Sequence, residues 1–259
     1  MIKLIASDLD GTLLYGRDNS ISEEMFSLVR EMKRRGILFA AASGRQYHCI
    51  KKLFEPVWED MVFISENGAA VFYQDKLIKA QVVPMEQLLE NVALIDADEH
   101  TQAVISSATT TYIRPKDPYY VQCLLNLGNR VSVVENWTDI KEPCLKIGWW
   151  ENKGADQRID HWAKLIKPPA KPVTSGADWI DLLYPNCDKG AGIQVVMEHF
   201  GLRKEEIAAF GDNYNDIEML ENVGYPIAME NGQEKIKKMC PYHTKRVEDS
   251  IRAILDGTF

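Results

Sequence analysis

Short apolar runs alternate with helix-like stretches at both ends of the chain. Residues 2–6 and 37–42 are mostly apolar and have the length of a buried strand, and between 23 and 35 apolar side chains recur every three or four positions. A strand, an amphipathic helix and a second strand form a βαβ unit, whose two strands lie parallel with a right-handed crossover. Residues 61–65 and 207–211 are similar runs. The pattern predicts an α/β fold built on a parallel sheet.

The middle of the chain has another pattern, in which short strand-like runs rich in β-branched residues follow helix-like runs. The expected helices cover 86–98, 119–127 and 155–166, and the expected strands cover 102–107, 110–113, 130–134 and 144–150. This order is typical of an α+β layer, an antiparallel sheet with helices on one face. We expect a proline-rich loop at 168–172, followed by a strand at 179–184.

These patterns predict two domains. Residues 84–180 form an inserted α+β domain, and residues 1–83 and 181–259 together form the α/β core.

Polar side chains follow the expected core strands. Asp8 and Asp10 come after the first strand, Ser43 after the second and Asn67 after the third. In open parallel sheets, ligands bind beyond the carboxyl ends of the strands, so these side chains are candidates for a site. Two acids one residue apart can divide the work of nucleophile or metal ligand and of proton carrier. Ser43 fits an anion site or a helix N-cap, and Asn67 fits a substrate contact or a turn.

The second half of the core adds a lysine and a further acidic stretch. Lys189 opens a predicted helix, where its charge is unfavourable beside the positive end of the dipole unless an anion lies nearby. Asp212 and Asp216 follow the apolar run at 207–211, and together with the first two acids they would make an oxygen cage suited to Mg²⁺. An EF-hand is excluded because Ile217 and Val223 occupy the positions that require Gly and Glu.

In this order, the segments resemble the four motifs of the haloacid dehalogenase superfamily: Asp-x-Asp-Gly-Thr at 8–12, Ser43, Lys189 and Gly-Asp-x-x-Asn-Asp at 211–216. The form of the last motif, the Asn-Gly-Ala at 67–69 and the place of the insertion are similar to the Cof-type phosphatase branch, which carries a C2B cap. The resemblance implies a Rossmann-like core of the haloacid dehalogenase type and an inserted α+β cap domain that closes over the active site.

The resemblance also implies an activity: Mg²⁺-dependent hydrolysis of small phosphorylated metabolites, such as a sugar phosphate or a phosphorylated cofactor, through an aspartyl phosphate. Asp8 would be the nucleophile, Asp10 the general acid and base, and Lys189 the residue that stabilises the phosphoryl charge. Mg²⁺ would be bound by Asp8, the backbone carbonyl of Asp10 and Asp212, with Asp216 in support.

The same resemblance supplies candidates for binding the phosphoryl group or substrate. They are Thr12, Ser43, Gly44, Asn215 and Asn67.

Other functions remain open. A phosphomutase or phosphotransferase acting on sugar phosphates shares the intermediate, and a receiver-like signalling protein would keep Asp8 phosphorylated. A glycosyltransferase that binds a metal–nucleotide through Asp-x-Asp would leave Lys189 and the second acidic cluster without a role. A dinucleotide-binding protein is excluded by the lack of a Gly-x-Gly-x-x-Gly loop.

Composition narrows the partners. The net charge of -8 argues against a broad nucleic-acid surface, which needs clustered Lys and Arg. No run approaches the ~18 apolar residues of a membrane span, and the five cysteines and five histidines show no metal-ligand spacing. We therefore expect a soluble, cytoplasmic enzyme that acts on a small phosphate ester, without membrane or nucleic-acid partners. The oligomeric state and the substrate cannot be determined from the sequence.

Two segments depart from the Cof-type pattern. Residues 228–232 read Ala-Met-Glu-Asn-Gly instead of Ala-Met-Gly-Asn-Ala, and the asparagine that usually precedes Glu-Asp is missing from 243–249. Neither change removes a predicted catalytic group, but both leave the substrate class open.

Overall fold

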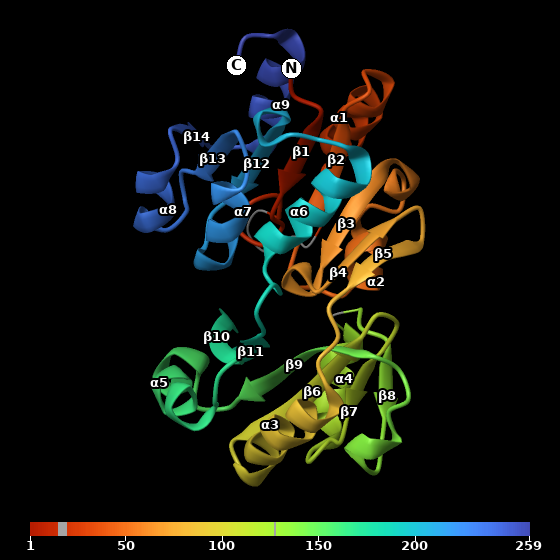
Figure 1. Ribbon diagram of the computed structural model, residues 1–259, viewed down its shortest axis with the longest axis vertical. Coiled ribbons are helices and arrows are strands. Elements are labelled where there is room, and N and C mark those ends of the chain that lie inside the picture. The colour runs from red at the N-terminus through yellow and green to blue at the C-terminus, as the bar shows by residue number, and fades with distance from the viewer. Residues whose placement is uncertain (15–19, 127) are drawn as a thin grey trace. The chain divides into compact units, whose positions relative to one another are not determined.

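The computed structural model describes residues 1–14, 20–126 and 128–259 and divides the chain into two compact units (Figure 1). Unit 1 comprises Met1–Lys79 and Asp188–Phe259, and unit 2 comprises Ala80–Cys187. Within the described ranges, no helix is both long and apolar enough to cross a membrane. Residue 127, the predicted end of a helix, lies outside them.

An eight-stranded sheet forms the centre of unit 1, in the order β14-β13-β12-β1-β2-β3-β4-β5. Every neighbouring pair from β14 to β3 is parallel, and β4 turns back antiparallel to β3. The strands are β1 Leu4–Ser7, β2 Leu38–Ala42, β3 Met61–Ser65, β4 Ala70–Tyr73, β5 Lys76–Ala80, β12 Ile207–Gly211, β13 Tyr225–Met229 and β14 Tyr242–Thr244. The predicted α/β fold with a parallel core sheet is confirmed.

Helices cover both faces of this sheet. The α-helices are α1 Glu23–Arg34, α2 Tyr47–Leu53, α6 Lys189–Phe200, α7 Ile217–Glu221, α8 Glu234–Met239 and α9 Val247–Asp256, and the 3-10 helices are η1 Trp58–Asp60, η2 Glu66–Gly68, η4 Lys204–Glu206 and η5 Tyr214–Asp216. On one face, Ile193 of α6 and Met219 of α7 pack with Ala6 and Ile64 of the strands. The opposite face carries a cluster of aromatic rings, in which Phe54 packs on Phe26, Phe39 and Phe63. Burial on both sides explains why the core strands are apolar throughout rather than alternating.

Unit 2 is built on a six-stranded sheet in the order β10-β11-β9-β6-β7-β8. Its strands are β6 Thr101–Ser107, β7 Thr111–Ile113, β8 Val131–Val133, β9 Cys144–Glu151, β10 Lys171–Gly176 and β11 Trp179–Leu183, and its helices are α3 Met85–Ala97, α4 Pro118–Asn126, α5 Ala155–Leu165 and the 3-10 helix η3 Trp137–Asp139. All pairs are antiparallel except β7 with β8. The α+β character is as predicted.

The prediction that helices lie on only one face of this sheet is wrong. Adjacent residues of a strand point to opposite faces, and both Trp149 and Trp150 of β9 pack against a helix. The Trp149 ring lies 4.9 Å from that of Trp162 in α5, and the Trp150 ring lies 6.0 Å from that of Tyr120 in α4. Trp149 and Trp150 therefore pack into layers on opposite faces of the sheet.

Two predicted boundaries in unit 2 are also wrong. The division at residue 180 cuts through β11, which pairs with β9 and β10 and so belongs wholly to the sheet of unit 2. An apolar run shows that a strand is present but not which sheet it joins. The loop expected at 168–172 ends early, because β10 begins at Lys171. Pro172 is tolerated there because β10 is an edge strand, whose outer side needs no backbone donor.

Candidate active site

Asp8 lies at the end of the central strand of unit 1. The residues of β1 are all buried and pair in parallel with β2 on one side and β12 on the other, so three strands end at the same edge. Beyond the last paired residue, the Asp8 N–H still donates to the carbonyl of Phe210 at 3.0 Å. This bond fixes the backbone of Asp8 beside the start of the acidic stretch that follows β12.

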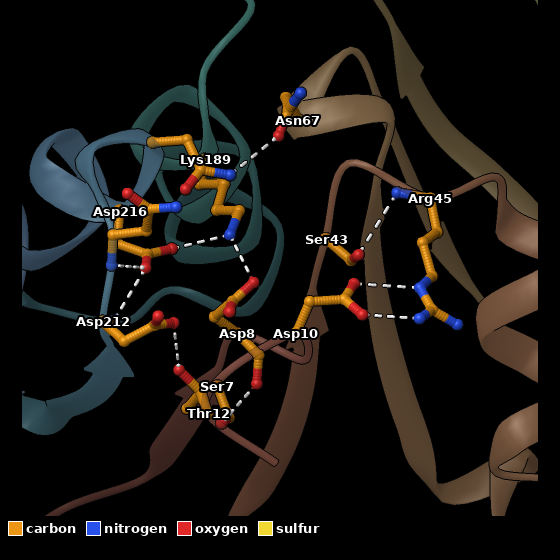
Figure 2. Close-up of polar contacts among 12 residues, drawn as sticks. Ser7, Asp8, Asp10, Thr12, Ser43, Arg45, Asn67, Lys189, Asp212 and Asp216 are labelled. Atoms are coloured by element: carbon orange, nitrogen blue, oxygen red, sulfur yellow. Dashed lines mark hydrogen bonds and ion pairs between the residues drawn. The ribbon is translucent and has the colours of Figure 1, made fainter. Parts of the chain in front are cut away.

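Lys189 joins two of the predicted acids. Its Nζ donates to Asp8 Oδ1 at 2.5 Å and to Asp216 Oδ1 at 2.6 Å (Figure 2). The lysine is fully buried at the first position of α6, whose N-cap Asp188 accepts a bond from the N–H of Ala191. Burial alone would lower the pKa of Lys189, but the charges of Asp216 and Asp8 outweigh it and raise the pKa above its ordinary value. The unfavourable charge at the helix start is thus compensated by two carboxylates.

Three carboxylates converge around this ammonium group. Asp8, Asp212 and Asp216 each offer an oxygen atom, and these atoms lie within 4.8 Å of one another. Burial raises the pKa of Asp8 well above its ordinary value of 3.8, despite the opposing charge of Lys189, and burial also raises that of Asp212. Three acids facing one ammonium group leave negative charge that the side chains do not balance. A hard divalent cation such as Mg²⁺ fits this set of oxygen ligands.

The loops around the acids restrain their orientation. Asp216 Oδ2 accepts the backbone N–H groups of Asp212 at 2.9 Å and of Asn213 at 3.0 Å. Thr12 is buried, and its hydroxyl donates to Asp212 Oδ1 at 2.8 Å. Thr12, predicted as a phosphate contact, therefore lies where it orients Asp212.

Ser43, Gly44, Asn67 and Asn215 lie together on one rim of the site. The N–H of Asn67 donates to the carbonyl of Ser43 at 3.0 Å, and Asn215 Nδ2 donates to Asn67 Oδ1 at 3.3 Å. A Cβ at Gly44 would lie 3.1 Å from both amide atoms of Asn67, so the glycine gives this side chain room. All four predicted binding residues of this rim are thus brought to one place.

Ser43 does not cap the next helix. That helix, α2, begins at Tyr47 after Gln46, whereas the N-terminus expected from the sequence was at Ser43. The Ser43 side chain instead accepts the backbone N–H of Arg45 at 3.2 Å. Because the hydroxyl accepts there, its own proton is available for an acceptor elsewhere.

Asp10 stands apart from the other acids. Its carboxylate points away from Asp8 toward Arg45, which binds both of its oxygens (Figure 2). The acidic cluster therefore contains Asp8, Asp212 and Asp216 but not the Asp10 side chain. Sequence reasoning missed Arg45. It lies two residues after Ser43, at the edge where the strands end, and that position is the signal that would have identified it.

The chain matches the family model described as haloacid dehalogenase-like hydrolase over residues 5–255. It is 27% identical to the 5-amino-6-(5-phospho-D-ribitylamino)uracil phosphatase of Escherichia coli, over 93% of this chain and 90% of the relative. It is 26% identical to phosphoglycolate phosphatase 1 of Saccharolobus solfataricus, over 100% of this chain and 98% of the relative.

Solved structures agree on the fold. A haloacid dehalogenase-like hydrolase of Bacteroides thetaiotaomicron superposes with a TM-score of 0.84 at 24% identity, over 98% of this chain and 100% of that one. The resemblance inferred from the four motifs is confirmed.

Proposed function

The chain belongs to the haloacid dehalogenase-like hydrolases, and from this premise we propose that it is a Mg²⁺-dependent phosphatase of small phosphorylated metabolites. The observation that carries the proposal is the buried carboxylate of Asp8, held by Lys189 at the end of β1 among further acids. A buried nucleophile that is fixed by a cation, beside oxygen ligands for a metal, suits attack on a phosphate ester.

In the proposed reaction, Asp8 attacks phosphorus and forms an aspartyl phosphate. Lys189 binds Oδ1, which leaves Oδ2 for the attack, and stabilises the charge that gathers on the phosphoryl group. Asp10 gives a proton to the departing oxygen of the ester. It then takes a proton from the water that hydrolyses the aspartyl phosphate and restores the Asp8 carboxylate.

Mg²⁺ would be held by Asp8, the backbone carbonyl of Asp10 and Asp212, with Asp216 in support. When bound, the cation would offset the negative charge brought together by the acids and the phosphate.

The rim would hold the remaining phosphoryl oxygens and the substrate. Ser43 offers a hydroxyl proton, Gly44 a backbone N–H, and Asn215 and Asn67 their amide groups. Thr12 would act through Asp212 rather than on the phosphate directly.

Unit 2, in the place of the predicted cap, would supply contacts to the leaving group and exclude water from the aspartyl phosphate. Among the aromatic side chains of unit 2, Tyr119 is exposed, whereas Trp149 and Tyr120 are buried. Tyr119 is therefore the better candidate. We place the enzyme in the cytoplasm, a reducing compartment in which its cysteines would remain thiols.

Phosphate release from a panel of phosphorylated metabolites tests this function. The panel includes sugar phosphates, phosphoglycolate and phosphorylated cofactors, each with Mg²⁺ and with a chelator. Asp8→Asn is compared with a control, Asp256→Asn, which removes an exposed carboxylate at the end of α9. We expect Mg²⁺-dependent release that is lost only in Asp8→Asn.

Product analysis separates the alternatives. A phosphomutase would return an isomerised sugar phosphate instead of free phosphate, and a receiver-like protein would accumulate long-lived phosphorylated Asp8. Full activity in Asp8→Asn would overturn the mechanism.

A further inference from the structure

Arg45 and Asp10 form a two-pronged ion pair at the rim of the site. Arg45 Nε lies 2.9 Å from Asp10 Oδ2 and Arg45 Nη2 lies 2.5 Å from Asp10 Oδ1. The Asp10 side chain is 57% exposed and that of Arg45 is 27% exposed. An exposed ion pair contributes little to stability, but a planar guanidinium bonded to both oxygens fixes the direction of a carboxylate.

The backbone of Arg45 is anchored on both sides. Its N–H donates to Ser43 Oγ at 3.2 Å, and its carbonyl accepts the N–H of Glu66 at 3.1 Å. The guanidinium therefore extends from a turn that is tied to η2 and reaches across the sheet edge to the loop after β1 (Figure 2). It links the acid–base candidate to the same turn that carries the predicted phosphoryl contact of Ser43.

Among the residues that the structure describes, few others restrain the Asp10 side chain. In the described part of the chain, Arg45 donates both of the hydrogen bonds that the Asp10 carboxylate accepts. The next residue, Gly11, adds no side chain to pack against it. Without Arg45, a half-exposed carboxylate on a short side chain would sample several rotamers.

We propose that Arg45 is a positioning residue that acts through Asp10, by holding its carboxylate in the direction that proton transfer requires. The inference rests on the proposed function. Each carboxylate oxygen has two lone pairs, so the oxygens bound to Arg45 keep one each for the substrate.

The role has two parts, one in each half of the reaction. As the bond between phosphorus and the leaving oxygen breaks and the Asp8–phosphorus bond forms, Asp10 gives its proton to that oxygen. As water attacks and the Asp8–phosphorus bond breaks, Asp10 takes the proton of the water. A disordered Asp10 slows both transfers, whereas binding of the phosphoryl group is left to other residues.

Single and double variants test the proposal: Arg45→Ala, Arg45→Lys, Asp10→Asn and the double variant Arg45→Ala with Asp10→Asn. General acid–base catalysis contributes about 10²–10⁴-fold, which sets the loss of kcat expected for Asp10→Asn. We expect Arg45→Ala to lower kcat at least about tenfold with KM nearly unchanged, and the double variant to be no slower than Asp10→Asn alone. Arg45→Lys, which keeps the charge but not the fork, should recover part of kcat.

A substrate with a good leaving group adds a readout that a purely structural role would not change. p-Nitrophenyl phosphate releases a weakly basic phenolate that departs without a proton, so Arg45→Ala should form the aspartyl phosphate quickly and hydrolyse it slowly. A burst of nitrophenolate should then precede the steady state. Arg130→Ala, which removes an exposed arginine of unit 2, is the control without a burst.

Two results would overturn the proposal. In the first, the loss of kcat in the double variant equals the product of the losses in the two single variants, and inorganic phosphate inhibits Arg45→Ala about tenfold more weakly than the natural chain. Arg45 would then contact the phosphoryl group itself. If Arg45→Ala keeps the natural kcat, Asp10 needs no positioning. Urea unfolding of each variant separates misfolding from either result. Failure of the proposed function is distinguishable from these results, because in that case the natural chain itself would release no phosphate.

Discussion

Gly11 and Asp212 lie in such close contact that the site has no room for a side chain at position 11. Gly11 has φ +89°, and a Cβ built on it would lie 2.5 Å from Asp212 Oδ2. The turn that redirects the chain after the two acids of the first motif therefore packs directly on the acid that follows β12. The pairing of β1 with β12 brings these two distant segments together, and the missing side chain at Gly11 allows them to approach this closely.

We predict that Gly11→Ala weakens Mg²⁺ binding. The methyl group displaces the Asp212 carboxylate, and disturbing the support of a metal ligand typically costs about 10–100-fold in affinity. The Mg²⁺ concentration for half-maximal phosphate release should rise by that factor. Gly36→Ala is the matched control, since Gly36 also has a positive φ, +73°, but nothing lies within 4 Å of its Cβ position.

Both substitutions place alanine in a left-handed conformation, which costs about 1–3 kcal/mol of the free energy of unfolding. A loss of Mg²⁺ affinity in Gly11→Ala that Gly36→Ala does not share would support the contact between position 11 and Asp212. Equal Mg²⁺ affinities would contradict it.

We predict that Asp8→Asn stabilises the chain in the presence of a chelator, and increasingly so as the pH rises. Burial raises the pKa of Asp8 in the folded state, so the folded chain holds this proton more tightly than the unfolded chain. Below the ordinary value of 3.8 both states are protonated and no penalty exists. The penalty grows as the pH rises toward the folded pKa and is constant above it. Asparagine carries no charge and escapes it.

Urea midpoints measured from about pH 3 to about pH 8 test this dependence. Asp75→Asn is a control of opposite sign: hydrogen bonds from Lys51 and Tyr47 lower the pKa of Asp75, so its stabilisation is present above 3.8 and lost as the pH falls. An advantage of Asp8→Asn that shrinks with rising pH would refute the assignment. Added Mg²⁺ should stabilise the natural chain and reduce the difference.

We predict that Asn67→Gly raises KM about 3–10-fold, as expected for one lost hydrogen bond of about 0.5–1.5 kcal/mol. Asn67 has φ 55°, a conformation that glycine adopts without strain, so the substitution removes the amide without bending the chain. Gln74→Gly is the control at a similar φ of 50° on an exposed turn. An unchanged KM in Asn67→Gly would mean that Asn67 only forms the turn.

The strand ends could be predicted from the sequence because a parallel sheet aligns them. Asp8, Ser43 and Asp212 each follow an apolar run, and position alone brought them to one edge. The ion pair between Arg45 and Asp10 could not be predicted in this way, because contacts between side chains of two loops produce no periodic pattern in the sequence. The same holds for Thr12, whose hydroxyl donates a hydrogen bond to an acid 200 residues away.

In unit 2, the pattern predicted every strand except β10, but neither the sheet of β11 nor the two faces of β9. Adjacent tryptophans look alike in a sequence, and only the helices packed against them show that Trp149 and Trp150 face opposite layers. Periodicity specifies elements, whereas the partners of each face depend on contacts distant in the sequence.

We predict that Trp149→Ala destabilises unit 2 alone. Trp149 is fully buried against Trp162, and truncation of a buried tryptophan costs about 3–5 kcal/mol. Tryptophan fluorescence can report on this unit, because five of the six tryptophans lie in it and Trp58→Phe removes the other. In the Trp58→Phe background, the urea midpoint followed by fluorescence should fall. Far-UV circular dichroism reports on both units, and the part of its transition that shifts when Mg²⁺ is added belongs to unit 1, so its midpoint should not change. If both signals shift together, the two units unfold as one, and the division into core and inserted domain has no thermodynamic counterpart.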